Sequence, residues 1–96
     1  LKPMFKPLDP LLHSELRLAV VSLLVSFREA EFGFLKEKTG ATAGNLSVQL
    51  QKLYEADYIV IEKSFRGNYP LTTCRITKKG IDAFGKYVEA IKGYWK

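Results

Sequence analysis

Residues 39–77 read TGATAGNLSVQLQKLYEADYIVIEKSFRGNYPLTTCRIT, a pattern that predicts a turn, a helix and a two-stranded hairpin. Its first part, residues 42–55, places Leu46, Leu50 and Leu53 on one stripe, because apolar residues three or four apart lie on the same face of an α-helix. The other faces carry small and amide side chains with no evident task inside the chain. We therefore expect an amphipathic helix with a polar outer surface.

A second helix is expected just before this one, over residues 32–39, with Gly40 as its C-cap. Two helices joined by a short Gly-containing turn form a helix-turn-helix, here over about residues 32–56. The following run, residues 58–65, begins apolar and then alternates, as a strand with a buried start does. A turn and a Thr-rich return complete a two-stranded hairpin over about residues 58–77.

Helices are expected on both sides of this unit. Residues 16–27 are apolar nearly all round, which is typical of a central helix covered on several sides, and the polar residues 28–31 are expected to close it. A last helix over about residues 78–95 places apolar residues at alternating spacings of three and four, a heptad-like seam. The residues of this seam are Ile81, Phe84, Val88, Ile91 and Trp95.

The composition indicates one folded domain over residues 1–96, with 47% apolar and 26% charged residues. No apolar stretch approaches the ~20 residues that span a bilayer, and no secretion signal opens the chain. A single cysteine excludes an internal disulfide. We expect a cytoplasmic protein without a membrane segment, and the start at Leu1 suggests that a few residues precede it.

The net charge of +5 is unevenly distributed. Residues 9–57 carry five basic and seven acidic residues, whereas residues 58–96 carry eight basic and three acidic ones. Attraction to phosphate, if present, is therefore expected to come mainly from the hairpin and the segment after it.

The order of elements, the residues Leu53, Tyr54, Asp57, Tyr58 and Ile59, the Arg66-Gly67 turn and the segment LTTCRITKKG (71–80) carry a family resemblance. The chain resembles the winged helix DNA-binding family of MarR-like and ArsR-like transcriptional regulators, especially their small single-domain archaeal and bacterial members. The resemblance runs from about Asp9 to about Tyr94. It is most specific in Thr77-x-x-Gly80 and in the Leu-x-x-Leu run of the preceding helix.

This resemblance implies an α+β, mostly helical fold, a winged helix-turn-helix with a two-stranded wing and an extra C-terminal helix. It implies a homodimeric repressor or activator that binds double-stranded DNA in a sequence-specific way. Helix 42–55 would enter the major groove, where Asn and Gln pair with adenine and Val touches a thymine methyl group. The wing, residues 63–75, would follow the backbone or the minor groove, with Arg66 as the best candidate for insertion. The predicted DNA contacts are Thr42, Gly44, Asn45, Ser47, Val48, Gln49, Gln51, Lys52, Lys63, Arg66, Asn68, Tyr69 and Arg75.

The C-terminal seam favours self-association, because an exposed apolar stripe of this length marks an interface. A twofold dimer would present two recognition helices to a pseudo-palindromic operator. The alternative is that the last helix folds back on its own core. The predicted dimer contacts are Met4, Phe5, Leu8, Leu11, Leu12, Ile81, Phe84, Val88, Ile91 and Trp95.

Other functions have weaker support. Cys74 is interpreted as a small core residue, with a redox sensor as the alternative. One histidine and one cysteine form no metal-ligand cluster, so neither a metal nor another cofactor is expected. The aromatic residues of the last helix fit a core or a dimer seam better than a pocket for a small-molecule effector, and the effector is not identified. We find no catalytic constellation and expect no enzyme. The alternative function is a winged helix that binds protein instead of DNA.

Overall fold

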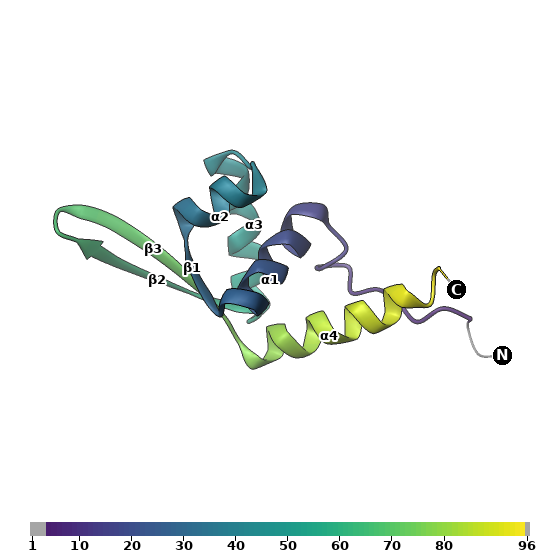
Figure 1. Cartoon of the computed structure of the whole chain (residues 1–96). Helices are drawn as coiled ribbons and strands as arrows, with labels where there is room; N and C mark the ends of the chain where they lie inside the picture. The colour runs from purple at the N-terminus through teal and green to yellow at the C-terminus, as the bar shows by residue number, and fades with distance from the viewer. Residues whose placement is uncertain (1–3, 96) are drawn as a thin grey trace.

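A computed structural model describes residues 4–95. Its elements are α1 (Glu15–Phe27), β1 (Glu29–Glu31), α2 (Phe32–Thr39), α3 (Ala43–Glu55), β2 (Ile59–Arg66), β3 (Tyr69–Ile76) and α4 (Lys78–Lys92). The strands form one antiparallel sheet in the order β1-β3-β2, and the hairpin of β2 and β3 projects from the helices as the wing (Figure 1). The fold is therefore the expected mostly helical winged helix.

The core lies where α1, α2 and α3 meet the base of the sheet. Its buried residues are Leu12, Val20, Val21, Leu24, Leu35, Leu46, Leu50, Leu53, Ile59, Cys74, Ile76 and Tyr87. The predicted leucine stripe of α3 is confirmed, because all three leucines are buried. In α1, however, Phe27 is 58% exposed. Its ring packs edge-on against the ring of Phe34, with the ring centroids 5.3 Å apart. The end of the central helix is thus less covered than its apolar sequence predicted.

Residues 28–31 do more than close α1, which corrects the sequence interpretation. Arg28 has a φ of 71°, which turns the chain out of the helix, and Glu29–Glu31 then pair with β3 as a third strand. The N–H of Ile76 donates to the carbonyl of Arg28 at 3.0 Å. Ala30 lies opposite the buried Cys74, so a three-residue strand suffices to close this side of the core.

The helix-turn-helix depends on two caps. Gly40 ends α2 in the left-handed region with a φ of 71°, a conformation that suits glycine. Thr42 then begins α3, because its hydroxyl accepts the N–H of Asn45 at 3.2 Å. The direction of α3 is therefore fixed within a few residues of the end of α2.

Thr77 and Gly80 join the wing to α4. The Thr77 N–H donates to the carbonyl of Tyr58 at 3.1 Å, and the Thr77 hydroxyl lies 2.7 Å from the carbonyl of Asp57 and accepts the N–H of Gly80 at 3.0 Å. Gly80 lies directly on the Tyr58 carbonyl, and a Cβ at Gly80 would also stand 2.8 Å from Cδ1 of Ile76. This contact gives the Thr-x-x-Gly signature its physical reason.

Tyr58 also anchors the segment that precedes α1. Its hydroxyl donates to the carboxylate of Asp9, whose other oxygen accepts the N–H of Leu11 at 2.9 Å. Burial, and then the hydrogen bond and charge of Asp9, raise the pKa of Tyr58 to about 12. The N-terminal segment, the base of the wing and the start of α4 therefore meet at one residue.

We predict that Gly80→Ala destabilises the protein by about 1–3 kcal/mol, since the new Cβ must displace backbone atoms of Tyr58 in a close-packed site. Gly85→Ala is the matched control in the same helix, because nothing lies within 4 Å of its Cβ position. Ala is the better helix former there, so this control should gain up to about 1 kcal/mol. Thermal denaturation measures both, and a Gly80→Ala protein as stable as the wild type would contradict the packing described.

We predict that Cys74 resists thiol reagents in the folded protein. Its side chain is fully buried, and burial raises the pKa of the thiol to about 11. The folded state therefore holds the thiol proton more tightly than the unfolded chain does. Below about pH 9 the thiol is protonated in both states and does not affect stability, whereas stability falls as the pH rises towards 11, because burial disfavours the thiolate.

A colorimetric thiol reagent at mildly alkaline pH checks this. Labelling should be limited by unfolding and should accelerate strongly in guanidinium chloride. Immediate complete labelling of the folded protein would instead support the redox-sensor alternative.

Candidate nucleic-acid interface

The outer surface of α3 is polar, small and free of core contacts. Six of its exposed residues were predicted from the sequence as DNA contacts, namely Gly44, Asn45, Ser47, Val48, Gln51 and Lys52. Val48 is 53% exposed, which places an apolar side chain at the centre of this surface. Thr42, also predicted, is exposed at the start of the helix, where its side chain serves as the N-cap. The arrangement offers amide, hydroxyl and methyl groups together, the types that discriminate base edges.

Gln49 differs from this prediction. It is half-buried, its Oε1 accepts from Nη1 of Arg17, and its Nε2 donates to Oδ1 of Asn45 at 3.0 Å. Arg17 in turn donates from Nε to the carbonyl of Leu11 at 2.6 Å. Gln49 therefore ties α3 to α1 and orients Asn45. The expectation that these amides have no task inside the chain is wrong for both residues.

Gln51 also makes a side-chain hydrogen bond, but a longer one than that of Gln49. Its Nε2 donates to Oε2 of Glu55 at 3.3 Å, one helical turn further along the exposed face. Both side chains are exposed, so a base edge can replace this bond at small cost. Gln51 therefore remains available on the outer surface, unlike Gln49.

A groove of about 550 Å³ separates α3 from the wing. Its lining residues are Phe32, Ser47, Leu50, Gln51, Tyr54, Ile61, Lys63 and Thr72. Tyr54, which the sequence analysis did not select, is 46% exposed in this lining. Helical spacing gives the signal that identifies it, because Tyr54 follows Gln51 by three residues and Ser47 by seven. On the α3 side, the groove is thus lined by hydroxyl and amide groups. On the side of the wing, it is lined by Lys63.

The two faces of the wing differ in chemistry. Ile59, Ile61, Lys63 and Phe65 alternate along β2, so they share the face that begins in the core and borders the groove. We call this the inner face. The outer face carries Glu62 and Arg66, together with their partners on β3. Figure 1 shows the long hairpin extending well beyond the helices.

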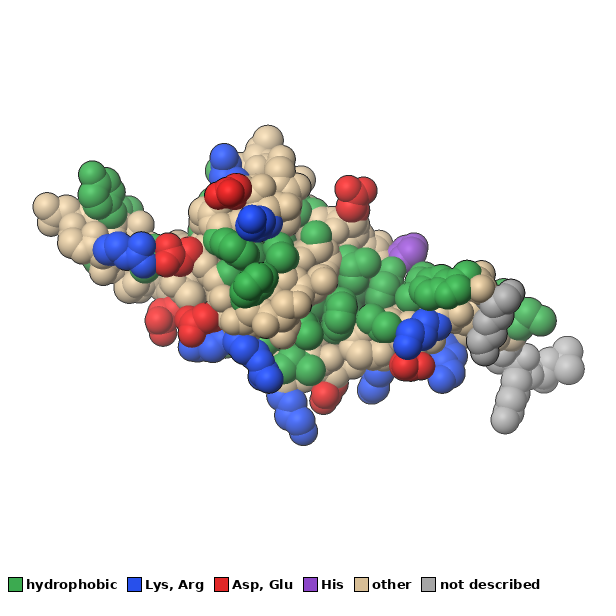
Figure 2. Space-filling view, viewed as in Figure 1, with side chains coloured by type: hydrophobic (Ala, Val, Ile, Leu, Met, Phe, Trp, Pro, Cys, Tyr) green, Lys and Arg blue, Asp and Glu red, His purple; other side chains and the backbone are tan. Residues whose placement is uncertain are grey.

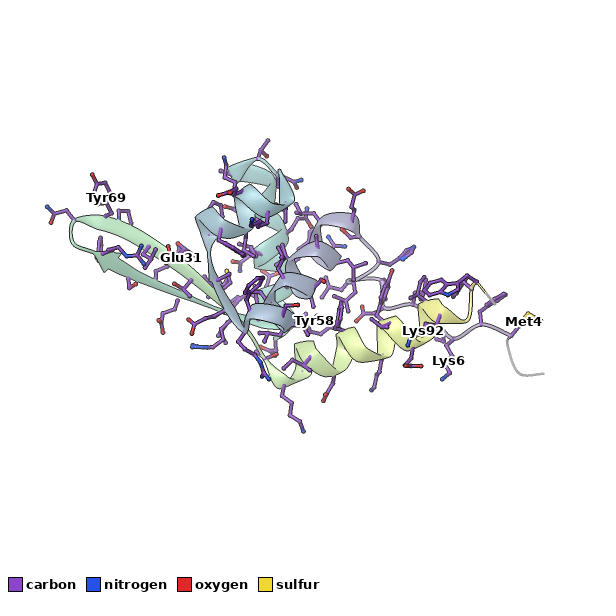
Figure 3. The ribbon with its side chains drawn as sticks, viewed as in Figure 1. Met4, Lys6, Glu31, Tyr58, Tyr69 and Lys92 are labelled. Carbon is purple, nitrogen blue, oxygen red and sulfur yellow. The ribbon has the colours of Figure 1, made fainter. Side chains whose placement is uncertain are left out.

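Arg66, the expected insertion residue, lies on the outer face and points back along the wing. Its Nη2 contacts Oε2 of Glu31 at 2.7 Å, which joins the end of β2 to the short strand β1. Arg75 similarly lies 4.0 Å from Glu62. Glu31 and Tyr69 are both labelled along the wing in Figure 3, Tyr69 near its end. Neither arginine is therefore an unpaired charge aimed into the groove.

These ion pairs change the electrostatic expectation for the wing. Among the described residues, Lys63 is the one basic side chain of β2 and β3 outside an ion pair. The pairs are solvent-exposed, so each is worth about 0–1 kcal/mol and a phosphate can compete for the arginine. Figure 2 shows further Lys and Arg side chains along the lower edge, over the base of the wing and α4. Much of the basic charge after residue 58 thus lies away from α3.

Asn68 and Tyr69 form the end of the wing. Asn68 follows Gly67, whose φ of 62° makes the tight turn, and Tyr69 is 79% exposed. Both side chains are accessible, and their contact with DNA stays a prediction. The structure also leaves Phe65 exposed near them, a residue that the sequence analysis did not select.

A second candidate surface lies on α4, whose inward stripe differs from the predicted seam. Gly80, Tyr87 and Ala90 are buried, and Tyr87 belongs to the chain's own core. The residues of the predicted seam lie on the neighbouring face of the helix. Ile81, Phe84, Val88 and Ile91 are half-buried there, and Trp95 is 66% exposed. The alternative that α4 folds back on its own core is thus supported, because Ile81, Phe84 and Ile91 also pack against that core. Self-association through the half-buried residues Ile81, Phe84, Val88 and Ile91, which we call the α4 stripe, stays a prediction.

The N-terminal segment packs along its own α4. Phe5 stacks on Tyr94 with ring centroids 4.6 Å apart, and Leu8 and Leu11 pack against the core. Leu12 is fully buried in that core, which corrects its prediction as a contact with another subunit. Met4 remains 87% exposed near the far end of α4 (Figure 3). The exposed large apolar side chains at this end are therefore Met4, Phe5, Tyr94 and Trp95, while the α4 stripe is half-buried.

Two kinds of site are absent from the described residues 4–95. No group of three or more His, Cys, Asp and Glu side chains is placed to hold a metal ion. No helix in this range has the length and hydropathy needed to span a membrane.

Comparison with solved structures supports the fold. The chain superimposes on a transcriptional regulator homologue from Pyrococcus horikoshii with a TM-score of 0.81, covering 88% of this chain and 83% of that one at 23% identity. It also superimposes on a MepR-like protein complexed with pseudoligands with a TM-score of 0.69 at 15% identity. Here 85% of this chain covers 60% of the other, so the MepR-like chain is considerably longer.

Comparison at the sequence level supports the family. An uncharacterised protein of Methanocaldococcus jannaschii is 37% identical over 79 residues, which cover 82% of this chain and 86% of that protein. A family model described as the winged helix DNA-binding domain matches residues 16–95, from the start of α1 to beyond α4. The chain therefore belongs to the winged helix DNA-binding domain family.

Proposed function

We propose that this protein is a homodimeric transcriptional regulator that binds double-stranded DNA, with α3 in the major groove and the wing along the adjacent backbone and minor groove. One observation carries the proposal. The exposed polar face of α3 and the inner face of the wing border the same groove, so both can meet one duplex. Family membership supports the same partner.

Individual roles follow from this placement. Asn45, Ser47, Val48 and Gln51 would meet base edges, while Thr42 and Gly44 let the start of α3 approach a phosphate closely. Lys52 and Lys63 would contact phosphates. The residues that would join them at the wing are Arg66, Asn68, Tyr69 and Arg75. Gln49 would act indirectly, by orienting Asn45.

The shape of the chain supports the dimer. Its radius of gyration is 14.7 Å, larger than the roughly 12.5 Å typical of a compact chain of this length. The excess comes from two arms, the wing at one end and α4 with the N-terminal segment at the other (Figure 1). We propose that the α4 stripe packs on its copy about a twofold axis, which would direct two α3 helices toward a pseudo-palindromic operator.

A protein-binding winged helix is the second candidate. It is favoured by the low charge of α3, which has Lys52 as its one basic residue, and by the exposure of Val48 and Tyr54. Duplex binding at varied salt separates the two candidates. A protein-binding module would show either no binding to the duplex or an affinity for the duplex that does not depend on salt.

We predict that the protein binds duplexes selected from a random pool with an affinity that falls steeply as salt rises. Lys63→Gln should weaken binding to all duplexes and make the log–log salt slope shallower by about one. Gln51→Ala should cost about 1–3 kcal/mol on the selected site but little on mixed sequence. Fluorescence anisotropy measures these changes.

Lys86→Gln is the matched control, because Lys86 is an exposed lysine on α4. It should alter neither the affinity for the selected site nor the sequence preference. Equal losses for Lys63→Gln and Lys86→Gln would contradict the assigned surface.

We predict that the wild type sediments as a dimer at micromolar concentration and that Val88→Glu sediments as a monomer. Val88 is half-buried but lies outside the set of side chains packed on the core, so a charge there should spare the fold. Lys86→Glu adds the same acid to the same helix away from the stripe and should remain dimeric. A monomeric wild type would contradict the dimer.

A further inference from the structure

Phe65 is the one large apolar residue of the wing's inner face that lies beyond the core. Its side chain is 74% exposed, although the hairpin register places it in line with the buried Ile59 and the half-buried Ile61. Its partner across the hairpin is Pro70, which is also exposed. The inner face therefore ends in an apolar pair that no part of the described chain covers.

The surroundings of Phe65 favour DNA as the group that covers it. Lys63 lies two residues before Phe65 on the same face, and beyond it the groove is lined by Ser47, Gln51 and Tyr54 from α3. Such a surface, apolar at its end and cationic and polar behind it, complements a minor groove with apolar sugar walls between phosphates. A protein partner would be expected to prefer a larger apolar patch.

The outer face of the wing carries the exposed Tyr69 and Arg66 at its end, and neither of them has a purely apolar side chain. Arg66 is held toward Glu31 at 2.7 Å, and insertion of its guanidinium would require that ion pair to break. Phe65 needs no such rearrangement, because it has no polar partner and is already exposed. Insertion of Phe65 thus breaks no ion pair of the wing, whereas insertion of Arg66 breaks one.

We propose that Phe65 is the residue that the wing inserts into the minor groove, where it wedges against a base step and bends the duplex. This inference rests on the proposed function and extends it to sequence preference. An apolar wedge partly unstacks the step that it enters, and pyrimidine–purine steps such as TA unstack most easily. The operator is therefore selected at the wing by its deformability as well as at α3 by its base edges.

The experiment compares two forms of the selected duplex, with a TA step or an AA step where the wing protects the minor groove. Wild type should prefer the TA form about tenfold and bend it, as measured by anisotropy and by energy transfer between dyes at the duplex ends. Phe65→Ala should bind both forms equally, with less bending and an unchanged salt slope. Phe65→Leu should retain most of the preference, because leucine is also an apolar wedge.

Two controls keep the test specific. Ser64→Ala removes a neighbouring exposed side chain and should leave the preference unchanged. Phe65→Ala should keep the wild-type melting temperature and sedimentation, since Phe65 lies outside the core.

The outcomes separate the two proposals. If the wild type binds no duplex, the proposed function and the wedge fail together. If Lys63→Gln weakens binding while Phe65→Ala keeps the preference and the bend, the wedge alone is wrong. A change in sedimentation on Phe65→Ala with unchanged DNA binding would assign Phe65 to a protein contact and overturn the wedge.

Discussion

The close contact between Gly80 and the carbonyl of Tyr58 is the constraint on which the rest of the arrangement depends. A side chain at position 80 has no space there, and Thr77 secures the contact by capping α4 and bonding the end of the α3–β2 turn. Tyr58 in turn holds Asp9 of the N-terminal segment. One junction thus sets how the wing, α4 and the segment before α1 lie relative to the core.

This junction keeps the candidate DNA-binding surface and the candidate dimer surface apart. On one side, α3 and the inner face of the wing border a common groove, where amide, hydroxyl and ammonium groups converge. On the other side, α4 extends away from α3 (Figure 1). Its half-buried apolar stripe would let a copy pack there without covering α3. The proposed function requires this separation, because a dimeric regulator must keep its recognition surfaces free while its subunits associate.

The sequence predicts well whatever is local and periodic. The leucine stripe of α3, the Gly40 turn and the Thr77-x-x-Gly80 signature all lie in short windows whose spacing reflects the local geometry. It predicts poorly the pairings between distant segments, such as Gln49 with Arg17 and Arg66 with Glu31, because long polar side chains carry no periodic signal. The sequence also did not predict the short strand β1 or which face of α4 is buried. Both depend on distant segments, because β1 exists only through its pairing with β3 and the buried face of α4 is the one that meets the rest of the chain.

In the proposed function, α3 and the inner face of the wing form one DNA-binding surface. Backbone amide NMR of the isotope-labelled protein, titrated with the selected duplex, tests this. The largest shift changes are expected in residues 42–55 and 61–72, with the exposed side of α4 little affected. Changes confined to α4 and the N-terminal segment, or an unchanged spectrum, would contradict it.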